Sequence, residues 1–323
     1  CMQHLFLGID PTSLGRAPYV PVVRDAVELR ADELGVAIFG RGRVYVMPSI
    51  AGFVGADTVA AILASGLTEF KEPAMLIDIG TNGEVALWDG ERLMVASCAA
   101  GPAFEGAQIS HGTRAIPGAI ERVDRVDGDI AISTVGGLPA VGICGSGLID
   151  AVAALLDLGL IDAAGRIKDG HTGPAARRVV GEGPDRAIVL AWPEQTADGR
   201  GIKLTQRDIR QVQLAKGAVR AAGELLLREA GLAGGELAAV MLAGAFGNYL
   251  NPHSAVRIGL LPSGVTPEQV RGIGNAAGAG AALALLSLQQ RQQATAIAKA
   301  AEHVELFTRP EFEQVFACLL YTS

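Results

Sequence analysis

A carboxylate followed by a glycine turn is the first feature of the sequence that could do chemistry. Asp78 lies near the end of the apolar run 75–79, and the turn after this run consists of Gly80, Thr81, Asn82 and Gly83. A carboxylate there can hold hydrated Mg²⁺, while the backbone N–H groups of the turn and the Thr81 hydroxyl can face phosphate oxygens. The sequence thus predicts a phosphate and metal site, with an ordinary β-hairpin and a capping aspartate as the alternative.

Two more glycine segments lie at predicted junctions between elements. The first, 142–147, opens a predicted helix, so Gly145 and Ser146 are candidate nucleotide contacts at an anion-binding helix N-terminus. Close helix–sheet packing would also explain these small residues. The second segment follows a predicted strand and could let an adenine ring lie against the backbone, although a plain βα turn has the same pattern. Its candidate contacts are Gly244, Ala245, Phe246 and Gly247.

Three isolated polar residues complete the candidate site. Glu105 lies among small apolar residues, where a carboxylate is uncommon unless it is paired, so it is a candidate to orient water or bind metal. A glutamate that satisfies backbone donors at a helix N-terminus is the alternative. Gln213 and Lys216 are three residues apart, share a helix face and could donate to a ribose or a phosphate. A solvated helix face would give the same spacing.

Periodicity predicts the elements that must position these residues. A meander of three antiparallel strands carries the Asp78 turn, and an Asp89-Gly90 pair predicts a two-residue hairpin turn within it. Thr205-x-x-Asp208 predicts a capped start for a long helix. The predicted strands are 75–79, 84–88, 92–97, 130–132, 187–191 and 238–243, and the predicted helices are 56–63, 148–158, 206–230, 272–286 and 294–302.

Composition excludes several classes of protein. Of 323 residues, 50% are hydrophobic and the net charge is −7, which excludes a disordered chain and argues against nucleic-acid binding. No charge-free apolar run reaches the roughly 18 residues of a membrane span. The four cysteines are far apart and form no C-x-x-C pair, which argues against a disulfide framework and against an iron–sulfur or zinc site in this chain. We therefore expect a cytoplasmic protein with reduced thiols.

At six segments the sequence resembles the C-terminal ATPase part of the reductive activators of corrinoid proteins. These segments are DIGTNGE at 78–84, AAGPAFEGAQI at 99–109, GICGSGLIDA at 142–151, QLAKGAV at 213–219, LAGAFGNYL at 242–250 and IGLLP at 258–262. That family belongs to the superfamily of acetate and sugar kinases, heat-shock ATPases and actin. The resemblance implies an α/β fold of two ribonuclease-H-like halves, with mixed sheets flanked by helices and ATP between the halves.

The resemblance also implies an activity. Family members use ATP hydrolysis to drive an electron from a [2Fe–2S] domain onto a corrinoid cobalt, which converts Co(II) to Co(I). The implied cofactors are ATP and Mg²⁺, the implied partner is a corrinoid protein, and a homodimer is expected. By matching position, 78–84 would be the second phosphate loop and 244–248 the adenosine loop, with Gln213 and Lys216 near the ribose.

The same resemblance suggests a division of the chain. Residues 1–70 are expected to be the remainder of the first half, 71–317 the second half and 318–323 a non-native tail. The [2Fe–2S] cysteines and the first phosphate loop are expected upstream of Cys1, so this chain alone is expected not to turn over ATP. Two alternatives remain: a small-molecule kinase with Glu105 as base, and a non-catalytic module for nucleotide binding and dimerisation.

Overall fold

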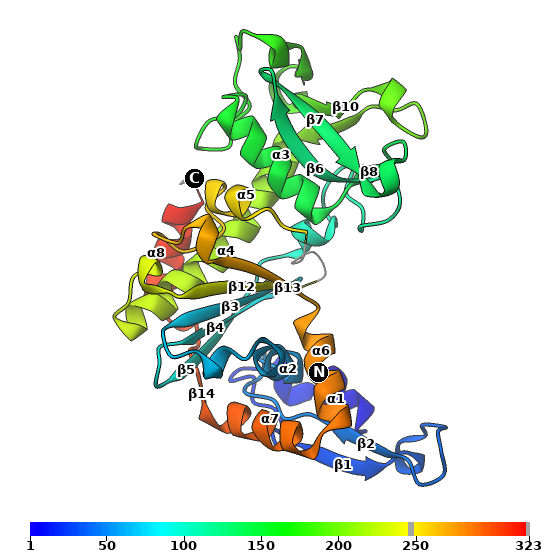
Figure 1. Ribbon diagram of the computed structural model, residues 1–323, viewed down its shortest axis with the longest axis vertical. Helices are drawn as coiled ribbons and strands as arrows, with labels where there is room; N and C mark the ends of the chain where they lie inside the picture. The colour runs from blue at the N-terminus through cyan, green and yellow to red at the C-terminus, as the bar shows by residue number, and fades with distance from the viewer. Residues whose placement is uncertain (245–248, 321–323) are drawn as a thin grey trace.

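A mixed six-stranded sheet forms the centre of the molecule. The computed structural model describes residues 1–244 and 249–320 (Figure 1). The three antiparallel strands of the predicted meander are flanked by β12 and β13 on one side, parallel to β3, and by β14 on the other, parallel to β5. In sheet order the strands are β13 (Val270–Gly274), β12 (Ala239–Ala243), β3 (Ala74–Ile79), β4 (Gly83–Trp88), β5 (Leu93–Cys98) and β14 (Ala301–His303).

Helices cover both faces of this sheet because its strands are apolar on both sides. Met75 and Ile77 join one buried cluster with the helix α4 (Gln206–Ala230). Leu76 joins a second cluster with α2 (Ala56–Ser65), α6 (Ala276–Leu286) and α7 (Leu288–Ala300). Strand side chains alternate between the two faces, so burial on both sides makes these strands near-continuous hydrophobic runs.

The long helix α4 begins as predicted. Thr205 Oγ1 accepts a hydrogen bond from Asp208 N at 3.2 Å, and Asp208 Oδ2 accepts one from Thr205 N at 2.8 Å. This reciprocal pair satisfies backbone donors that the first turn of a helix would otherwise leave unpaired. The helix ends at Gly231, whose φ of 69° is in the left-handed region that favours glycine.

A separate α/β unit is inserted in the chain between β5 and α4. Figure 1 shows it at one end of the molecule. Its two three-stranded sheets lie near α3 (Gly145–Asp157), which packs against β6 and against α5 (Pro252–Arg257) of the central unit. Its strands are β6 (Ala119–Val126), β7 (Asp129–Thr134), β8 (Gly142–Ile143), β9 (Val179–Val180), β10 (Ala187–Ala191) and β11 (Ile202–Thr205).

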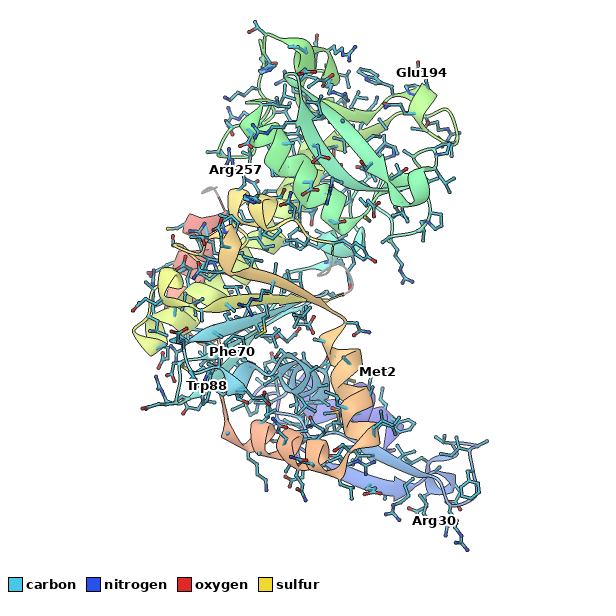
Figure 2. All side chains as sticks on the ribbon, in the orientation of Figure 1. Met2, Arg30, Phe70, Trp88, Glu194 and Arg257 are labelled. Carbon is cyan, nitrogen blue, oxygen red and sulfur yellow. The ribbon has the colours of Figure 1, made fainter. Side chains whose placement is uncertain are left out.

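The opposite end holds the N-terminal residues together with α6 and α7 (Figure 1). Phe70, in the segment after α2, is hydrogen-bonded to the central sheet: the indole Nε1 of Trp88 in β4 donates to the Phe70 carbonyl at 2.9 Å (Figure 2). The remaining elements are α1 (Met2–Phe6), the paired strands β1 (Val27–Arg30) and β2 (Arg43–Val46), and α8 (Pro310–Leu319), which packs on α4.

Three local predictions were wrong. Residues 270–274 form the strand β13, and the helix begins only at 276, after the Asn275 side chain caps it. The helix predicted at 294–302 begins at 288 and gives way to β14 at 301. The β4–β5 connection has four residues, because Trp88 pairs with Leu93. β13 is a short edge strand of sequence VRGIG, directly before the glycine- and alanine-rich helix α6, so periodicity did not separate the strand from the helix.

Candidate nucleotide site

Two carboxylates and a hydroxyl form a row across the end of the central sheet. Asp78 of β3 is opposite Glu84 of β4, and Glu84 is opposite Ser97 of β5, so all three side chains lie on one face. Ser97 Oγ donates to Glu84 Oε1 at 3.2 Å. This is the face that α2 covers, and Asp57 lies in the first turn of α2. The sheet and a helix start thus place three acidic side chains near one another.

Burial of this acidic row perturbs its titration. Burial, together with the negative charge of Asp57, raises the pKa of Asp78 to about 6. Burial and Asp57 also raise the pKa of Glu84 to about 8, although the hydrogen bond from Ser97 acts in the opposite direction. Burial is the larger cause of both pKa shifts, and the neighbouring negative charges add to it. A bound cation would offset those negative charges.

The glycine turn after Asp78 brings Glu105 to the site. Thr81 Oγ1 donates to Glu105 Oε2 at 2.7 Å, and the Thr81 carbonyl accepts from Gly101 N at 2.9 Å. Glu105 is exposed and lies in a short 3₁₀ turn that follows the Gly101–Pro102 step. Thr81 and Glu105, which are 24 residues apart in sequence and were predicted in two separate motifs, therefore meet at the Gly80–Gly83 turn.

A buried carboxylate fixes the segment that carries Glu105. Asp208 Oδ1 accepts from Ser110 N at 2.8 Å and from Ser110 Oγ at 3.1 Å, while its other oxygen caps α4. The Asp208 side chain is fully buried, whereas Ser110, which donates to it, is exposed. Asp208 is thus a positioning residue for the Glu105 segment.

The second predicted glycine turn begins beside the first. Gly244 has a φ of 109°, and a Cβ there would lie 2.4 Å from the Ile79 carbonyl and 3.4 Å from Asp78 Oδ1. Only glycine permits this approach, because any side chain would strike the end of β3. The predicted contacts Ala245, Phe246 and Gly247 lie outside the described residues. The described part of this turn nevertheless starts within contact of Asp78.

The glycine segment before α3 is tightly packed. A Cβ at Gly147 would lie 2.2 Å from the Ile120 carbonyl, so close helix–strand packing accounts for this glycine. Gly145 and Ser146 are buried in the first turn of α3, and the Ser146 hydroxyl lies 3.4 Å from Cys144 Sγ. Their contact with a nucleotide stays a prediction.

Gln213 and Lys216 do share a face of α4, but other groups engage their side chains. Gln213 Nε2 donates to the Ala164 carbonyl at 2.9 Å and to the Leu320 carbonyl at 3.1 Å. Lys216 Nζ donates to the Leu319 carbonyl at 2.7 Å, and burial lowers its pKa to about 8. These bonds run to the C-terminal segment and to the inserted unit rather than to the Gly80–Gly83 turn. Their role near a ribose remains a prediction.

The donor set at Asp78 fits a hydrated magnesium ion better than a fully protein-bound metal. Among the residues that the structure describes, no three His, Cys, Asp or Glu side chains are grouped closely enough to hold a metal ion. Mg²⁺ usually keeps several waters and binds through one or two carboxylates plus substrate phosphates. Asp78, with Asp57 and Glu84 nearby, matches that pattern.

The sequence reasoning missed Asp57, and it named Glu84 only as the end of the 78–84 segment, without a role of its own. Glu84 alternates with apolar residues in a strand, which normally indicates a solvent-facing position. Asp57 lies 21 residues before Asp78, in an element that the sequence treats as an ordinary helix. The signal that could have identified Glu84 is the strand pairing itself, since a short turn places it opposite Asp78.

Comparison with known proteins identifies the family. Residues 72–322 match the family described as the C-terminal domain of RACo, the ASKHA domain, and residues 1–70 match the RACo middle region. The chain belongs to the RACo family. The actin-like α/β fold expected from the sequence is thereby confirmed, and so is the resemblance to corrinoid activators.

Known RACo relatives extend well beyond this chain. The chain is 41% identical over 319 residues to the corrinoid activation enzyme RamQ of Eubacterium limosum, covering 98% of the chain and 53% of RamQ. It is 31% identical over 326 residues to a Co(II) methylated amine-specific corrinoid protein reductase of Methanosarcina barkeri, covering 93% of the chain and 55% of the reductase. A solved structure of a reductive activator for corrinoid, iron–sulfur protein is 37% identical to the chain, with a TM-score of 0.91. The match covers 99% of this chain and 51% of the activator. The chain thus spans about half the length of these relatives.

Proposed function

We propose that this chain is the ATP-binding part of a reductive activator of a corrinoid protein, in which ATP hydrolysis drives reduction of cobalt from Co(II) to Co(I). The observation that carries the proposal is the convergence of Asp78, the Thr81–Glu105 pair and Gly244 at one end of the sheet. RACo-family membership supports the proposal, because the relatives named above are activators and reductases of corrinoid proteins.

The residues at this end of the sheet have separable roles in the proposal. The backbone N–H groups of Gly80–Gly83 would hold phosphate oxygens, while the Thr81 hydroxyl donates to Glu105. Asp78 would hold a hydrated Mg²⁺ through one of its waters. The metal ion, when bound, neutralises phosphate charge, and this neutralisation is the main requirement of phosphoryl transfer. Glu105, fixed by Thr81, orients the attacking water and accepts its proton.

The electron in the proposed reaction comes from outside the described residues. Two of the four cysteines are buried, two are exposed, and none is in a disulfide. No group of three or more ligating side chains that could hold a metal occurs in residues 1–244 and 249–320. The described residues therefore do not fit a [2Fe–2S] cluster, and we assign that cluster to a separate upstream domain. This chain contributes the ATP-driven step.

The organisation of the molecule forms part of the same proposal. We assign residues 1–70 to the remainder of the first ribonuclease-H-like half and the residues from 71 onward to the second half. A corrinoid protein is the partner, the active assembly is a homodimer, and the reaction takes place in the cytoplasm. No helix among the described residues is long and apolar enough to cross a membrane.

Calorimetry of Mg-ATP binding tests the nucleotide site directly. Replacement of Asp78 by alanine should weaken Mg²⁺-dependent binding at pH 7.5 by roughly tenfold or more, because the metal loses a charge-assisted interaction. The fold should persist, since Asp78 ends a strand and is only partly buried. Glu91→Gln, at an exposed position of the β4–β5 turn, is the matched control and should bind like the parent.

A chimera tests the activity. This chain would replace the matching half of RamQ, and visible absorbance would report loss of Co(II) from the corrinoid partner. We expect ATP-dependent formation of Co(I) with release of free phosphate, and loss of both in Glu105→Gln. Accumulation of a phosphorylated metabolite would favour the small-molecule kinase, and equal binding of Mg-ATP by Asp78→Ala would remove Asp78 from the site.

A further inference from the structure

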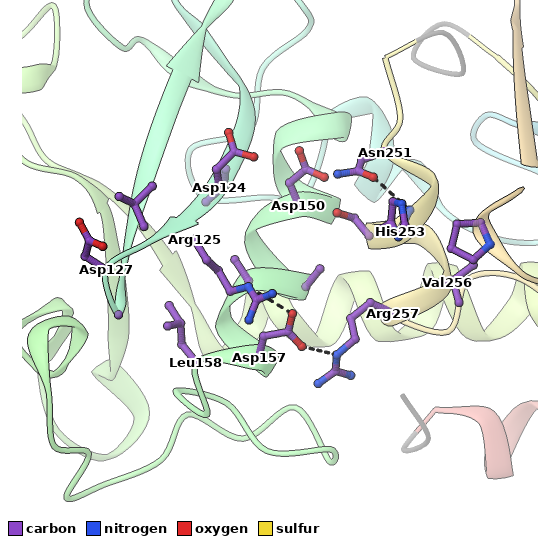
Figure 3. Close-up of a pocket in the computed structure, with 17 residues that line it drawn as sticks. Asp124, Arg125, Asp127, Asp150, Asp157, Leu158, Asn251, His253, Val256 and Arg257 are labelled. Atoms are coloured by element: carbon purple, nitrogen blue, oxygen red, sulfur yellow. Dashed lines mark hydrogen bonds and ion pairs between the residues drawn. The ribbon is translucent and has the colours of Figure 1, made fainter.

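A cavity of about 830 Å³ lies between the β6–β7 hairpin, α3 and α5. Its volume is in the range of ordinary small-ligand pockets. Figure 3 shows that its walls carry charged and polar side chains from all three elements. No residue of the Gly80–Gly83 turn lines it, so it is distinct from the phosphate end of the candidate site.

One buried carboxylate oxygen in this cavity has no partner. Asp150 of α3 is only 3% exposed, and its Oδ1 makes no hydrogen bond. Figure 3 shows the side chain directed from α3 toward Asn251 at the start of α5. Burial raises the pKa of Asp150, against the opposing effect of hydrogen bonds from the Ser254 hydroxyl and the Val123 backbone. Buried polar atoms are nearly always paired in folded proteins, so an orphan facing a cavity indicates a missing donor.

The other aspartate on this face of α3 is already neutralised. Asp157, seven residues after Asp150, lies 3.4 Å from Arg125 of the hairpin and 2.5 Å from Arg257 of α5. Seven residues at 1.5 Å of rise per residue place Asp157 about 10 Å from Asp150 along α3. The two arginines that pair with Asp157 therefore bound the cavity at that distance from Asp150. Asp124 and Asp127 of the hairpin also line the cavity, but both are exposed to solvent. Asp150 is therefore the buried carboxylate of this cavity that has an oxygen without a partner.

The chain connects this cavity to both predicted nucleotide loops. Asp150 follows Gly145 by little more than one turn of α3, and Asn251 comes three residues after the 244–248 loop. A nucleotide whose phosphates lie at Gly80–Gly83, and which passes the Gly244 turn, would extend its nucleoside end toward Asn251 and Asp150. The nucleoside end of ATP carries O–H and N–H donors of the kind that the orphan oxygen lacks.

We propose that Asp150 is the residue that determines nucleoside specificity, because it accepts a hydrogen bond from a ribose hydroxyl or from the adenine amino group. The inference rests on the proposed ATP site and gives a role to Asp150, a residue of the 142–151 segment to which the sequence assigned none. It adds the cavity between α3 and α5 to the nucleoside contacts predicted at Gln213 and Lys216.

Binding of ATP analogues to the whole chain tests the inference. Calorimetry would compare Mg-ATP with 2′-deoxy-ATP, which lacks a ribose donor, and with purine riboside triphosphate, which lacks the amino donor. The parent should bind one of the two analogues roughly tenfold or more weakly than ATP, as expected for a lost bond to a charged acceptor. Asp150→Ala should lose that discrimination. Parent and variant, each with ATP and the analogue, form a double-mutant cycle that isolates the coupling between the Asp150 carboxylate and the missing donor of the nucleoside.

Controls separate this inference from the proposed function. Asp185→Ala removes an exposed aspartate of the same inserted unit, outside the cavity, and should keep the parent's discrimination. If the parent binds ATP and both analogues equally, or if Asp150→Ala still discriminates, Asp150 has no such role and the ATP site itself stands. If the parent binds no Mg-ATP, both proposals fail.

A measurement on the parent chain avoids any question of folding. Photolabelling with 8-azido-ATP followed by peptide mapping should mark residues 145–157 or 251–257, and excess ATP should suppress the label. ATP-protected label confined to other segments would overturn the inference even if Asp150→Ala did not fold.

Discussion

At the residue scale, the raised pKa of Glu84 predicts how the stability of the folded chain changes with pH. The value is about 8 in the folded protein and near 4.5 in an unfolded chain. Below pH 4.5 the group is neutral in both states and stability is unaffected. Between pH 4.5 and 8 the unfolded chain ionises first, so stability is lost progressively, and the loss is complete above pH 8.

Glu84→Gln should therefore stabilise the ligand-free chain at pH 8 and leave it almost unchanged at pH 4.5. The gain should be about 1 kcal/mol or more, since one pKa unit corresponds to about 1.4 kcal/mol. Urea unfolding at the two pH values measures it, with the exposed Glu91→Gln as control. An equal change at both pH values would show that the effect of Glu84 is steric rather than electrostatic.

At the element scale, the crossing of α2 and α6 depends on a single glycine. A Cβ at Gly280 would lie 1.9 Å from the Ala60 carbonyl oxygen, and backbone cannot move aside as a flexible side chain can. The two helices form one buried cluster with a face of the central sheet. The separation of these helices, and hence the packing of that face, is fixed by the absence of a side chain.

Gly280→Val should force the helices apart and lower the free energy of unfolding by roughly 1–3 kcal/mol or more, as overpacking does in other cores. Gly15→Val places the same side chain where nothing lies within 4 Å of the new Cβ, so it should change stability far less. Denaturant unfolding compares the two variants. Similar losses in both would mean that the crossing can relax.

The sequence predicted correctly those features that depend on residues close together in the chain. The strand–turn–strand geometry at Asp78, the Thr205–Asp208 cap and the order of the three meander strands are local patterns, and each was confirmed. The acidic row required knowledge of which strand residues lie opposite one another and which helix covers them. Asp57, Glu84 and Asp150 acquire their environments only through such long-range packing, and no short pattern records it.

At the scale of the whole molecule, the inserted unit and the central sheet share one hydrophobic core. Ile120, Leu148 and Ile188 of the inserted unit belong to the same buried cluster as Met75 and Ile77 of β3. A continuous core couples the two parts energetically, so we expect them to unfold in a single transition.

The two tryptophans test this coupling, because Trp88 lies on the central sheet and Trp192 lies next to β10 in the inserted unit. Trp88→Phe leaves only the inserted unit fluorescent, and Trp192→Phe leaves only the sheet. Within each variant, the fluorescence midpoint should equal the circular-dichroism midpoint in urea. A fluorescence transition that precedes the circular-dichroism transition in one variant would show that the two parts melt separately.

The double role of Asp208 has a consequence for how such a protein can evolve. Ser110 comes before the first strand of the inserted unit, and Thr205 ends its last strand, β11. One buried carboxylate, 98 residues after Ser110, therefore joins the two ends of the insertion. The entry and exit points are thereby held together independently of what lies between them. Loops of the insertion can lengthen, shorten or change their surface under selection for a new partner, while the Glu105 segment keeps its place beside the phosphate turn.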